Sequence, residues 1–269
     1  MRVPYTFVQQ QLAKGTYRPS FVSSIINESM QNARDGILDH DTENTIMSVA
    51  GIMYGAGADT TATVLSAFIL AMVMYPEVQQ KAQQEIDTII GNRLPDFKDK
   101  ESLPYVSAVT MEAMRWFPIT PINTAHAVSS EIHYKGYRIP KGSHLLVSTW
   151  WLLHDPNTYH DPTSFSPERF LERNEPDPAT MVFGYGRRIC PGRYVADKSL
   201  FITISRILAT FTIGKGAGQA RLQITPGLIA HPMEFPFEIT PRSPTHAGLV
   251  QAIEKDNPWE KADAGLLAI

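Results

Sequence analysis

The sequence predicts a mainly α-helical fold with one small β-sheet, and three observations support this prediction. Apolar residues recur at helical spacing over most of the chain, between breaks at glycine and proline. Short alternating runs between residues 126 and 148, separated by turns at Gly136 and Gly142, indicate the small sheet. With 43% apolar and 19% charged residues among 269, the composition is that of a globular protein with a sizeable core.

The first part of the chain contains the longest predicted helix. Residues 4–13 have a weak helical pattern, and residues 15–19 form a break before a second helix at 20–31. Polar residues at 39–42 can cap a long helix over residues 43–75. Pro76 ends this helix, because proline cannot donate the backbone hydrogen bond that continues it.

The rest of the chain alternates helices with shorter elements. Residues 76–90 predict an amphipathic helix that ends at Gly91, and residues 104–116 a further helix after a polar connection. The remaining predicted elements are an extended segment at 118–121, strands at 126–130, 132–134, 137–139 and 145–148, a short helix at 150–154, a proline-rich loop at 155–180, a helix at 194–211 and strands within 223–240. From Pro241 onward the chain is polar, and we expect it to be loosely held beyond Gln251.

Charge and hydropathy argue against several kinds of partner. The net charge of -3 and the lack of a long basic run predict no nucleic-acid binding. Residues 1–11 have no apolar core of signal-peptide length. The longest apolar tract, residues 62–75, is shorter than the ~20 residues that cross a bilayer. We therefore expect no membrane span, anchor or signal in this chain.

Cys190 is the only cysteine in the sequence, so no internal disulfide is possible, which suits a reducing compartment. It lies in the segment Phe-Gly-Tyr-Gly-Arg-Arg-Ile-Cys-Pro-Gly at residues 183–192. Gly184 and Gly186 make the preceding backbone flexible, and Pro191 suits the first turn of a helix. At a helix N-terminus the free N–H groups and the dipole favour an anionic sulfur, as a nucleophile or a metal ligand requires.

Three interpretations of this cysteine compete. A buried, unreactive thiol is the usual fate of a free cysteine, but a loop rich in glycine and arginine is poor core. A phosphatase-type nucleophile is disfavoured, because Arg193 comes too early in the loop and Ala196 lies near the required position. The third interpretation is haem ligation. The loop resembles the cysteine-loop signature of the cytochrome P450 (haem-thiolate) family at five positions: Phe183, Gly186, Arg188, Cys190 and Gly192.

The long helix contains Ala-Gly-Ala-Asp-Thr-Thr at residues 56–61. A glycine within a helix costs about 1 kcal/mol relative to alanine, and the Thr60 hydroxyl can bond the carbonyl four residues earlier. By residue type alone, Asp59 and its neighbours equally suit the polar face of a buried helix. The segment resembles the distal-helix motif of the same family. That resemblance implies that Asp59 and Thr60 are catalytic and transfer protons, and that Gly57 makes room for dioxygen.

Two further segments resemble a structural element of that family. Glu112 and Arg115 are spaced i, i+3 on one predicted helix, which alone indicates only a common surface pair worth ~0.5 kcal/mol. They match the family's Glu-x-x-Arg element, and Pro-Glu-Arg-Phe at 167–170 matches the later segment that supplies its partner, Arg169. The resemblance implies a buried network of Glu112, Arg115 and Arg169 with a structural role.

His126 begins one of the predicted short strands, where a lone histidine is usually structural. The strand and the following turn resemble the family strand whose histidine or arginine binds a haem propionate. The resemblance implies that His126 and Arg188 bind the two propionates through charge-assisted hydrogen bonds. With Phe183 and Gly186, and with Cys190 as the axial ligand of the iron, they form the expected binding site for haem b.

The motifs occur in the family's order at similar separations, and the chain is identified as a fungal-like member of the cytochrome P450 family. The resemblance begins near the middle of a family member, so the expected fold is an N-terminally truncated cytochrome P450 fold. Residues 1–250 are expected to form a partial haem domain and residues 251–269 a polar C-terminal tail. Full-length relatives lie on the cytoplasmic side of the endoplasmic reticulum, held by an anchor that this chain is expected to lack.

The implied activity is monooxygenation of a lipophilic small molecule, in fungal specialised metabolism. NADPH-cytochrome P450 reductase is the implied redox partner, docking where Arg187, Arg193 and Lys198 offer positive charge; the alternative is three solvated side chains. The implied substrate contacts are residues 53–56, 119–123 and 228–232, which are mainly small or apolar. Two alternatives stay open: a non-catalytic remnant that binds haem weakly or not at all, and a haem-free interaction module.

Overall fold

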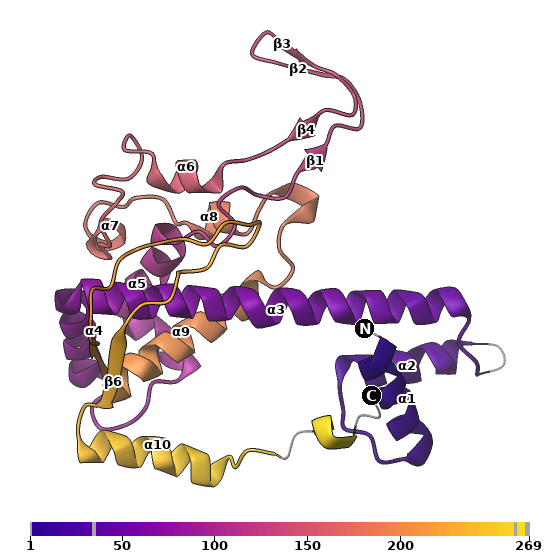
Figure 1. The fold of residues 1–269 in the computed structure, drawn as a ribbon, viewed down its shortest axis with the longest axis horizontal. Coiled ribbons are helices and arrows are strands. Elements are labelled where there is room, and N and C mark those ends of the chain that lie inside the picture. Colours follow the sequence, from indigo (N-terminus) through magenta and orange to yellow (C-terminus); the bar gives the residue numbers. More distant parts are fainter. Residues whose placement is uncertain (1, 34–35, 261–262, 267–269) are drawn as a thin grey trace. The chain divides into compact units, whose positions relative to one another are not determined.

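The computed structural model describes residues 2–33, 36–260 and 263–266, which form two compact units. One unit contains residues 1–59 and 257–269, and the other contains residues 60–256. The long helix α3 (His40–Met74) carries the chain from the first unit into the second (Figure 1). Each unit has its own core.

The smaller unit is built on α1 (Arg2–Lys14), α2 (Phe21–Asn32) and the first part of α3. Its core contains one buried side chain from each helix: Tyr5, Ile26 and Ile46. Ser20 and Ser23 form a capping box that begins α2, since each hydroxyl accepts from the other's backbone N–H. The short helix η3 (Asp263–Leu266) also belongs to this unit, where Arg18 forms an ion pair with Glu260 at 2.8 Å.

Helix α3 begins and ends close to where the sequence predicts. The Asp39 carboxylate accepts a hydrogen bond from the Thr42 N–H at 2.8 Å, and Pro76 follows the last helical residue by two positions. Phe68, Leu70 and Met72 in its second part are fully buried in the core of the larger unit. By length and composition α3 is a candidate membrane span, and 44% of the apolar window is buried within the protein.

The larger unit packs the end of α3 with α4 (Pro76–Ile89), α5 (Pro104–Trp116) and α9 (Arg193–Thr210). Prolines at the first helical position begin α4 and α5, as predicted. Side chains from all four helices form one continuous core. Gln79 of α4 joins this core to the strand that follows α9, because its amide donates to the Ile213 carbonyl at 2.9 Å and accepts from the Ile213 N–H at 2.8 Å.

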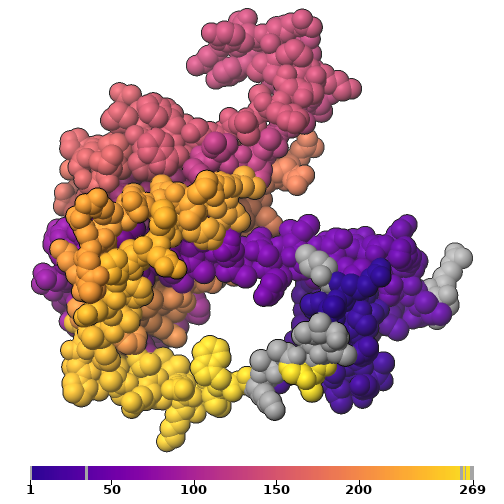
Figure 2. Space-filling model, in the orientation of Figure 1, coloured from indigo at the N-terminus to yellow at the C-terminus, as the bar shows by residue number. Residues whose placement is uncertain are grey.

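The described strands form three separate antiparallel pairs. β1 (His126–Ala127) pairs with β4 (His144–Leu145), β2 (Ile132–Tyr134) with β3 (Tyr137–Ile139), and β5 (Phe211–Lys215) with β6 (Phe237–Pro241). The expectation that the strands of residues 126–148 share one sheet is therefore wrong. Strands of two or three residues that bury neither face have nothing to pack a wider sheet against. Figures 1 and 2 show the β2–β3 hairpin standing away from the helices of its unit.

Shorter elements connect these parts: η1 (Phe97–Ser102), α6 (Thr149–His154), α7 (Glu168–Leu171), α8 (Ala179–Val182), η2 (Gly186–Arg188) and α10 (Pro244–Asp256). Two segments of the chain differ from what the sequence predicts. Phe211 begins β5 instead of ending a helix, since its strand pairs over five residues with β6. The polar tail contains α10, which begins at Pro244 where the Ser243 hydroxyl bonds the imidazole of His246 at 2.8 Å.

Candidate functional site

The loop before Cys190 is held in shape by its own backbone. The Cys190 N–H donates to the Phe183 carbonyl at 2.8 Å, and the Ile189 N–H donates to the Gly186 carbonyl at 3.2 Å. Gly184 and Gly186 have φ angles of 77° and 60°, a region that side chains disfavour. Phe183 is half-buried and packs against the main core. The loop is thus a tight, glycine-dependent turn fixed to the core at one end.

The Cys190 thiol is free and half-buried at the end of this loop. Helix α9 begins at Arg193, so the expectation that Pro191 lies in its first turn is wrong; Pro191 and Gly192 form the turn that leads into it. The Arg193 guanidinium donates to the Cys190 carbonyl at 3.1 Å, which ties the loop to the first turn of the helix. The thiol still lies within two residues of the helix N-cap, Gly192.

The side chains expected to bind the haem carboxylates are Arg188 in the loop and His126 in β1. Among the described residues no group of three or more histidine, cysteine or acidic side chains is placed to hold a metal ion. Arg188 and His126 are exposed, and among the described residues neither side chain forms a hydrogen bond or an ion pair, so both side chains can bind carboxylates. Gly186 has open space where a Cβ would project.

Asp59 and Thr60 lie in an uninterrupted stretch of α3, so the Ala-Gly-Ala-Asp-Thr-Thr segment does not break the helix. Asp59 is exposed and Thr60 half-buried. A Cβ added to Gly57 would meet nothing within 4 Å, which leaves open space on that side of the helix. Asp59 and Cys190 belong to different compact units, and their juxtaposition stays a prediction.

The structure brings Glu112, Arg115 and Arg169 together in a fully buried network, with 0% of each exposed. Arg115 binds both carboxylate oxygens of Glu112, through Nε at 2.7 Å and Nη2 at 2.8 Å. Arg169 donates from Nε to the same carboxylate at 3.0 Å. Glu175 is a fourth member that sequence reasoning missed, because its Oε2 accepts from Arg169 Nη1 at 2.6 Å and no spacing rule singles it out.

Backbone carbonyls from the end of α6 and from the proline-rich loop complete the network. Arg115 donates to the carbonyls of Leu153 at 2.8 Å and Pro162 at 2.9 Å, and Arg169 donates to that of His160 at 2.8 Å. The loop has almost no regular secondary structure, so its carbonyls need such donors when they are buried. The two guanidinium groups thus fix the path of the chain between α6 and α7.

Burial and charge in the network shift nearby ionisation equilibria. Burial opposes the charge of Arg169, but Glu112 and Glu175 outweigh it and raise the pKa of the guanidinium. His154 is buried and stacked on the Trp150 ring with centroids 4.5 Å apart. Burial, with smaller effects of Arg115 and Arg169, lowers the pKa of His154 to about 4. Its imidazole is therefore neutral near pH 7.

Two of the three segments expected to contact a substrate lie together. The Ala230 N–H donates to the Ile119 carbonyl at 2.8 Å, which joins residues 228–232 to the segment after α5. Leu228, two residues before Ala230, is 58% exposed. Residues 53–56 are exposed and belong to the smaller unit, so their part in such a site stays a prediction.

Of the three basic residues expected to meet a redox partner, Arg187 and Lys198 are exposed. Arg193 is half-buried, and besides the Cys190 carbonyl its guanidinium contacts the Tyr194 ring at 4.3 Å from the centroid. The Arg193 guanidinium thus already binds groups of this chain, whereas Arg187 and Lys198 are exposed to a partner protein.

Comparison with known proteins identifies similar chains. The family model described as cytochrome P450 matches residues 5–238. Cytochrome P450 monooxygenase CLM2 of Gibberella zeae is 46% identical, over 99% of this chain and 52% of the relative. The multifunctional cytochrome P450 monooxygenase af510 of Aspergillus fumigatus is 40% identical over 98% and 51%. O-methylsterigmatocystin oxidoreductase of Aspergillus flavus is 39% identical over 97% and 50%.

A solved structure gives the same likeness in three dimensions. A zebra fish cytochrome P450 determined with abiraterone has a TM-score of 0.74 and 30% identity, over 89% of this chain and 59% of that chain. The chain spans about half the length of the curated relatives it matches.

Proposed function

Because the chain belongs to the cytochrome P450 family, we propose that it carries haem-thiolate monooxygenase chemistry, inserting one oxygen atom of O2 into a lipophilic small molecule. The cofactor is haem b (iron protoporphyrin IX). Residues 1–250 form a partial haem domain, and residues 251–269 a polar tail. The relatives quoted above include fungal monooxygenases, which supports a role in fungal specialised metabolism.

The observation that carries this proposal is the position of Cys190. A half-buried, free thiol ends a glycine loop, two residues before the N-cap of the 18-residue helix α9. A free cysteine sulfur is a possible ligand for a metal. The loop also contains Arg188, two residues before the cysteine, and this residue is exposed. The pairing of one anionic ligand with nearby cationic groups suits an iron porphyrin, which needs an axial ligand and partners for its two carboxylates.

The proposed roles follow from the chemistry of each side chain. When bound, the haem supplies O2 activation, and a thiolate ligand favours O–O cleavage by donating electron density. Cys190 provides that sulfur, Arg188 and His126 bind carboxylates, and Phe183 and Gly186 shape the loop. Asp59 and Thr60 hold and transfer protons through a carboxylate and a hydroxyl, groups suited to that task.

The proposed substrate is lipophilic, such as a terpenoid, sterol, polyketide or fatty acid. Residues 53–56, 119–123 and 228–232 are its proposed contacts, and they carry mainly small or apolar side chains. The names of relatives support this class, since one is an O-methylsterigmatocystin oxidoreductase and a similar structure was determined with progesterone. Preferential turnover of a strongly charged substrate would contradict it.

The proposed redox partner is NADPH-cytochrome P450 reductase, at the cytoplasmic side of the endoplasmic reticulum. Arg187 and Lys198 offer exposed positive charge near the cysteine loop, where it would steer encounter with an acidic surface. Charge at the rim of an interface changes the association rate more than the affinity. We expect turnover with the reductase to fall with ionic strength for this reason.

The test is the carbon monoxide difference spectrum of the reduced chain supplied with haem. A strongly red-shifted Soret band reports a thiolate ligand, and we expect the band in the unaltered chain and its loss in Cys190→Ala. Circular dichroism of both proteins checks that the variant keeps its helices. A band typical of a histidine- or thiol-ligated haem, or no incorporation, would contradict the proposal and favour a non-catalytic remnant.

A further inference from the structure

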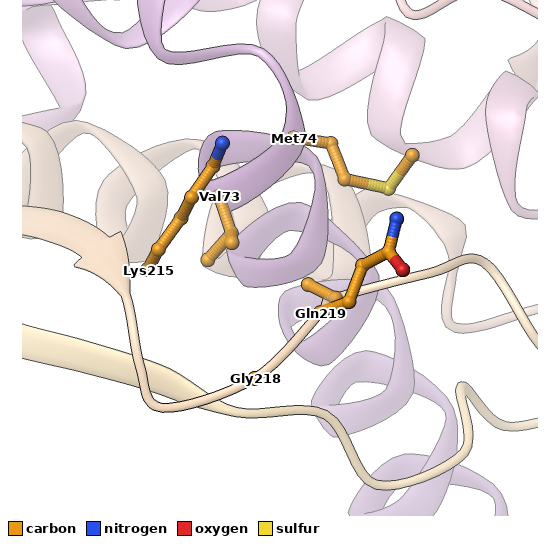
Figure 3. A pocket seen from close by; sticks show the side chains of 6 residues that line it. Val73, Met74, Lys215, Gly218 and Gln219 are labelled. Carbon is orange, nitrogen blue, oxygen red and sulfur yellow. The ribbon is translucent and has the colours of Figure 1, made fainter.

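The segment between β5 and β6, residues 216–236, returns to helix α3 (Figure 1). Its base is closed at Gly216, where an added Cβ would lie 2.7 Å from the Phe237 backbone nitrogen. Farther along, Gly218 and Gln219 face Val73 and Met74 of α3 across a pocket (Figure 3). The beginning of the segment therefore lies against the C-terminal end of α3.

The far end of the segment is a narrow hairpin. Ile224 and Pro232 form an antiparallel bridge, and the Met233 N–H donates to the Gln223 carbonyl at 2.8 Å. Thr225 and His231 form two more bonds within it: the Thr225 N–H donates to the His231 carbonyl, and the His231 N–H to the Thr225 hydroxyl, both at 2.9 Å. These bonds fix the shape of the tip, residues 226–230, but not its position on the protein.

The position of the tip is set in part by hydrogen bonds to two other segments of the chain. The Ala230 N–H donates to the Ile119 carbonyl at 2.8 Å, and Ala230 is 1% exposed. The Thr63 hydroxyl of α3 forms a hydrogen bond with Nδ1 of His231 at 2.9 Å, and Thr63 is 3% exposed. A hydroxyl can donate to an unprotonated ring nitrogen or accept from a protonated one, so either tautomer of His231 preserves this bond.

We infer that Thr63 and His231 are positioning residues, whose hydrogen bond fixes the hairpin tip against α3. Ala230 is buried in the main core and bonded to the Ile119 carbonyl, and the bond between Thr63 and His231 adds an attachment of the tip to α3. Thr63 follows Thr60 by three residues, so the two hydroxyls share one face of the helix. The bond therefore sets where the exposed Leu228 side chain lies relative to Thr60 and, on the function proposed above, how a lipophilic substrate is oriented.

The test compares amide hydrogen exchange of the 269-residue chain and its variants by mass spectrometry. Thr63→Val removes the hydroxyl while keeping the shape of the side chain, and His231→Ala removes the partner from the less buried side. We expect exchange in residues 224–232 to become about threefold to tenfold faster in both variants. Thr63→Ser, which keeps the hydroxyl, should restore the rate to within about twofold of the unaltered chain.

Thr110→Val is the matched control. Thr110 is also 3% exposed, but its hydroxyl donates to the Val106 carbonyl of its own helix at 3.0 Å. This variant should leave exchange in residues 224–232 unchanged. Equal exchange in the unaltered chain and Thr63→Val would overturn the inference, as would an equal increase in Thr110→Val, which would indicate general loosening of the core.

A second readout is the ratio of products from O-methylsterigmatocystin and from progesterone, with reductase and haem supplied. Thr63→Val and His231→Ala should change this ratio, and Thr63→Ser should not. An unchanged ratio would refute the effect on substrate orientation. Absence of turnover in the unaltered chain would contradict the proposed function, and hydrogen exchange would still decide whether the bond positions the hairpin.

Discussion

Replacing Glu112 by alanine is the substitution whose cost follows most directly from the structure. The carboxylate accepts four hydrogen bonds, two from Arg115, one from Arg169 and one from the Ser166 N–H. Arg169 keeps Glu175 as a partner, but Arg115 retains only neutral carbonyls. The variant therefore leaves one guanidinium group fully buried without a counter-charge.

Removal of one partner from a buried ion pair costs about 3–5 kcal/mol. The free energy of unfolding of a domain is about 5–15 kcal/mol, so Glu112→Ala should bring the larger unit close to unfolding. We expect it also to lower the fraction of chain that incorporates haem, because the network fixes the loop between α6 and α7.

Urea unfolding followed by tryptophan fluorescence measures this loss. The change is made in a Trp259→Phe background, so that the remaining three tryptophans, Trp116, Trp150 and Trp151, all report on the larger unit. Trp116 is a direct reporter, since its indole N–H donates to the Thr163 carbonyl beside the network at 2.9 Å.

Glu131→Ala is the control, because the ion pair of Glu131 with Arg138 is exposed, with side-chain exposures of 41% and 68%. Its loss should cost no more than about 1 kcal/mol. A loss of less than about 1 kcal/mol in Glu112→Ala, matching this control, would refute the assignment of Glu112 as the central carboxylate of the network.

Three further predictions concern other parts of the chain. The pKa of His154 is lowered to about 4, so the unfolded state binds more protons between pH 4 and its ordinary value near 6.5. Stability should fall by about 3 kcal/mol as the pH falls through this window, and urea titrations of His154→Gln should lack that slope. Gly216→Ala places a Cβ 2.7 Å from the Phe237 nitrogen and should cost about 1–3 kcal/mol, whereas alanine at the open Gly248 should not. Thr60→Ala should leave the carbon monoxide spectrum intact while NADPH is consumed with little product; normal coupling would remove its proposed role in proton transfer.

The sequence determined the main helices, because their signals are local. Prolines at 76 and 104 begin α4 and α5 at the predicted residues, and the end of α5 at Trp116 also matches. The cysteine loop and the Glu-x-x-Arg spacing were visible as short motifs. Proline and glycine restrict or free the backbone at their own positions. The helix ends that they mark can therefore be predicted without knowledge of distant contacts.

Strand pairing could not be predicted from local sequence signals in the same way. Phe211 continues a helical pattern in the sequence, yet it begins β5 because residues 237–241 lie beside it and supply a partner strand. The strands near residue 130 show the opposite effect, since nothing packs against their faces to join them in one sheet. Whether such a segment is a strand depends on the neighbour that completes its hydrogen bonds.

Only the tertiary structure decided which distant side chains meet. Glu175 enters the network because the loop after α7 turns back on Arg169, and no periodicity marks it. Thr63 and His231 are 168 residues apart and meet at 2.9 Å. A motif records groups that are close along the chain, whereas a hydrogen bond needs only that two groups be close in space, and the packing of the core brings these together.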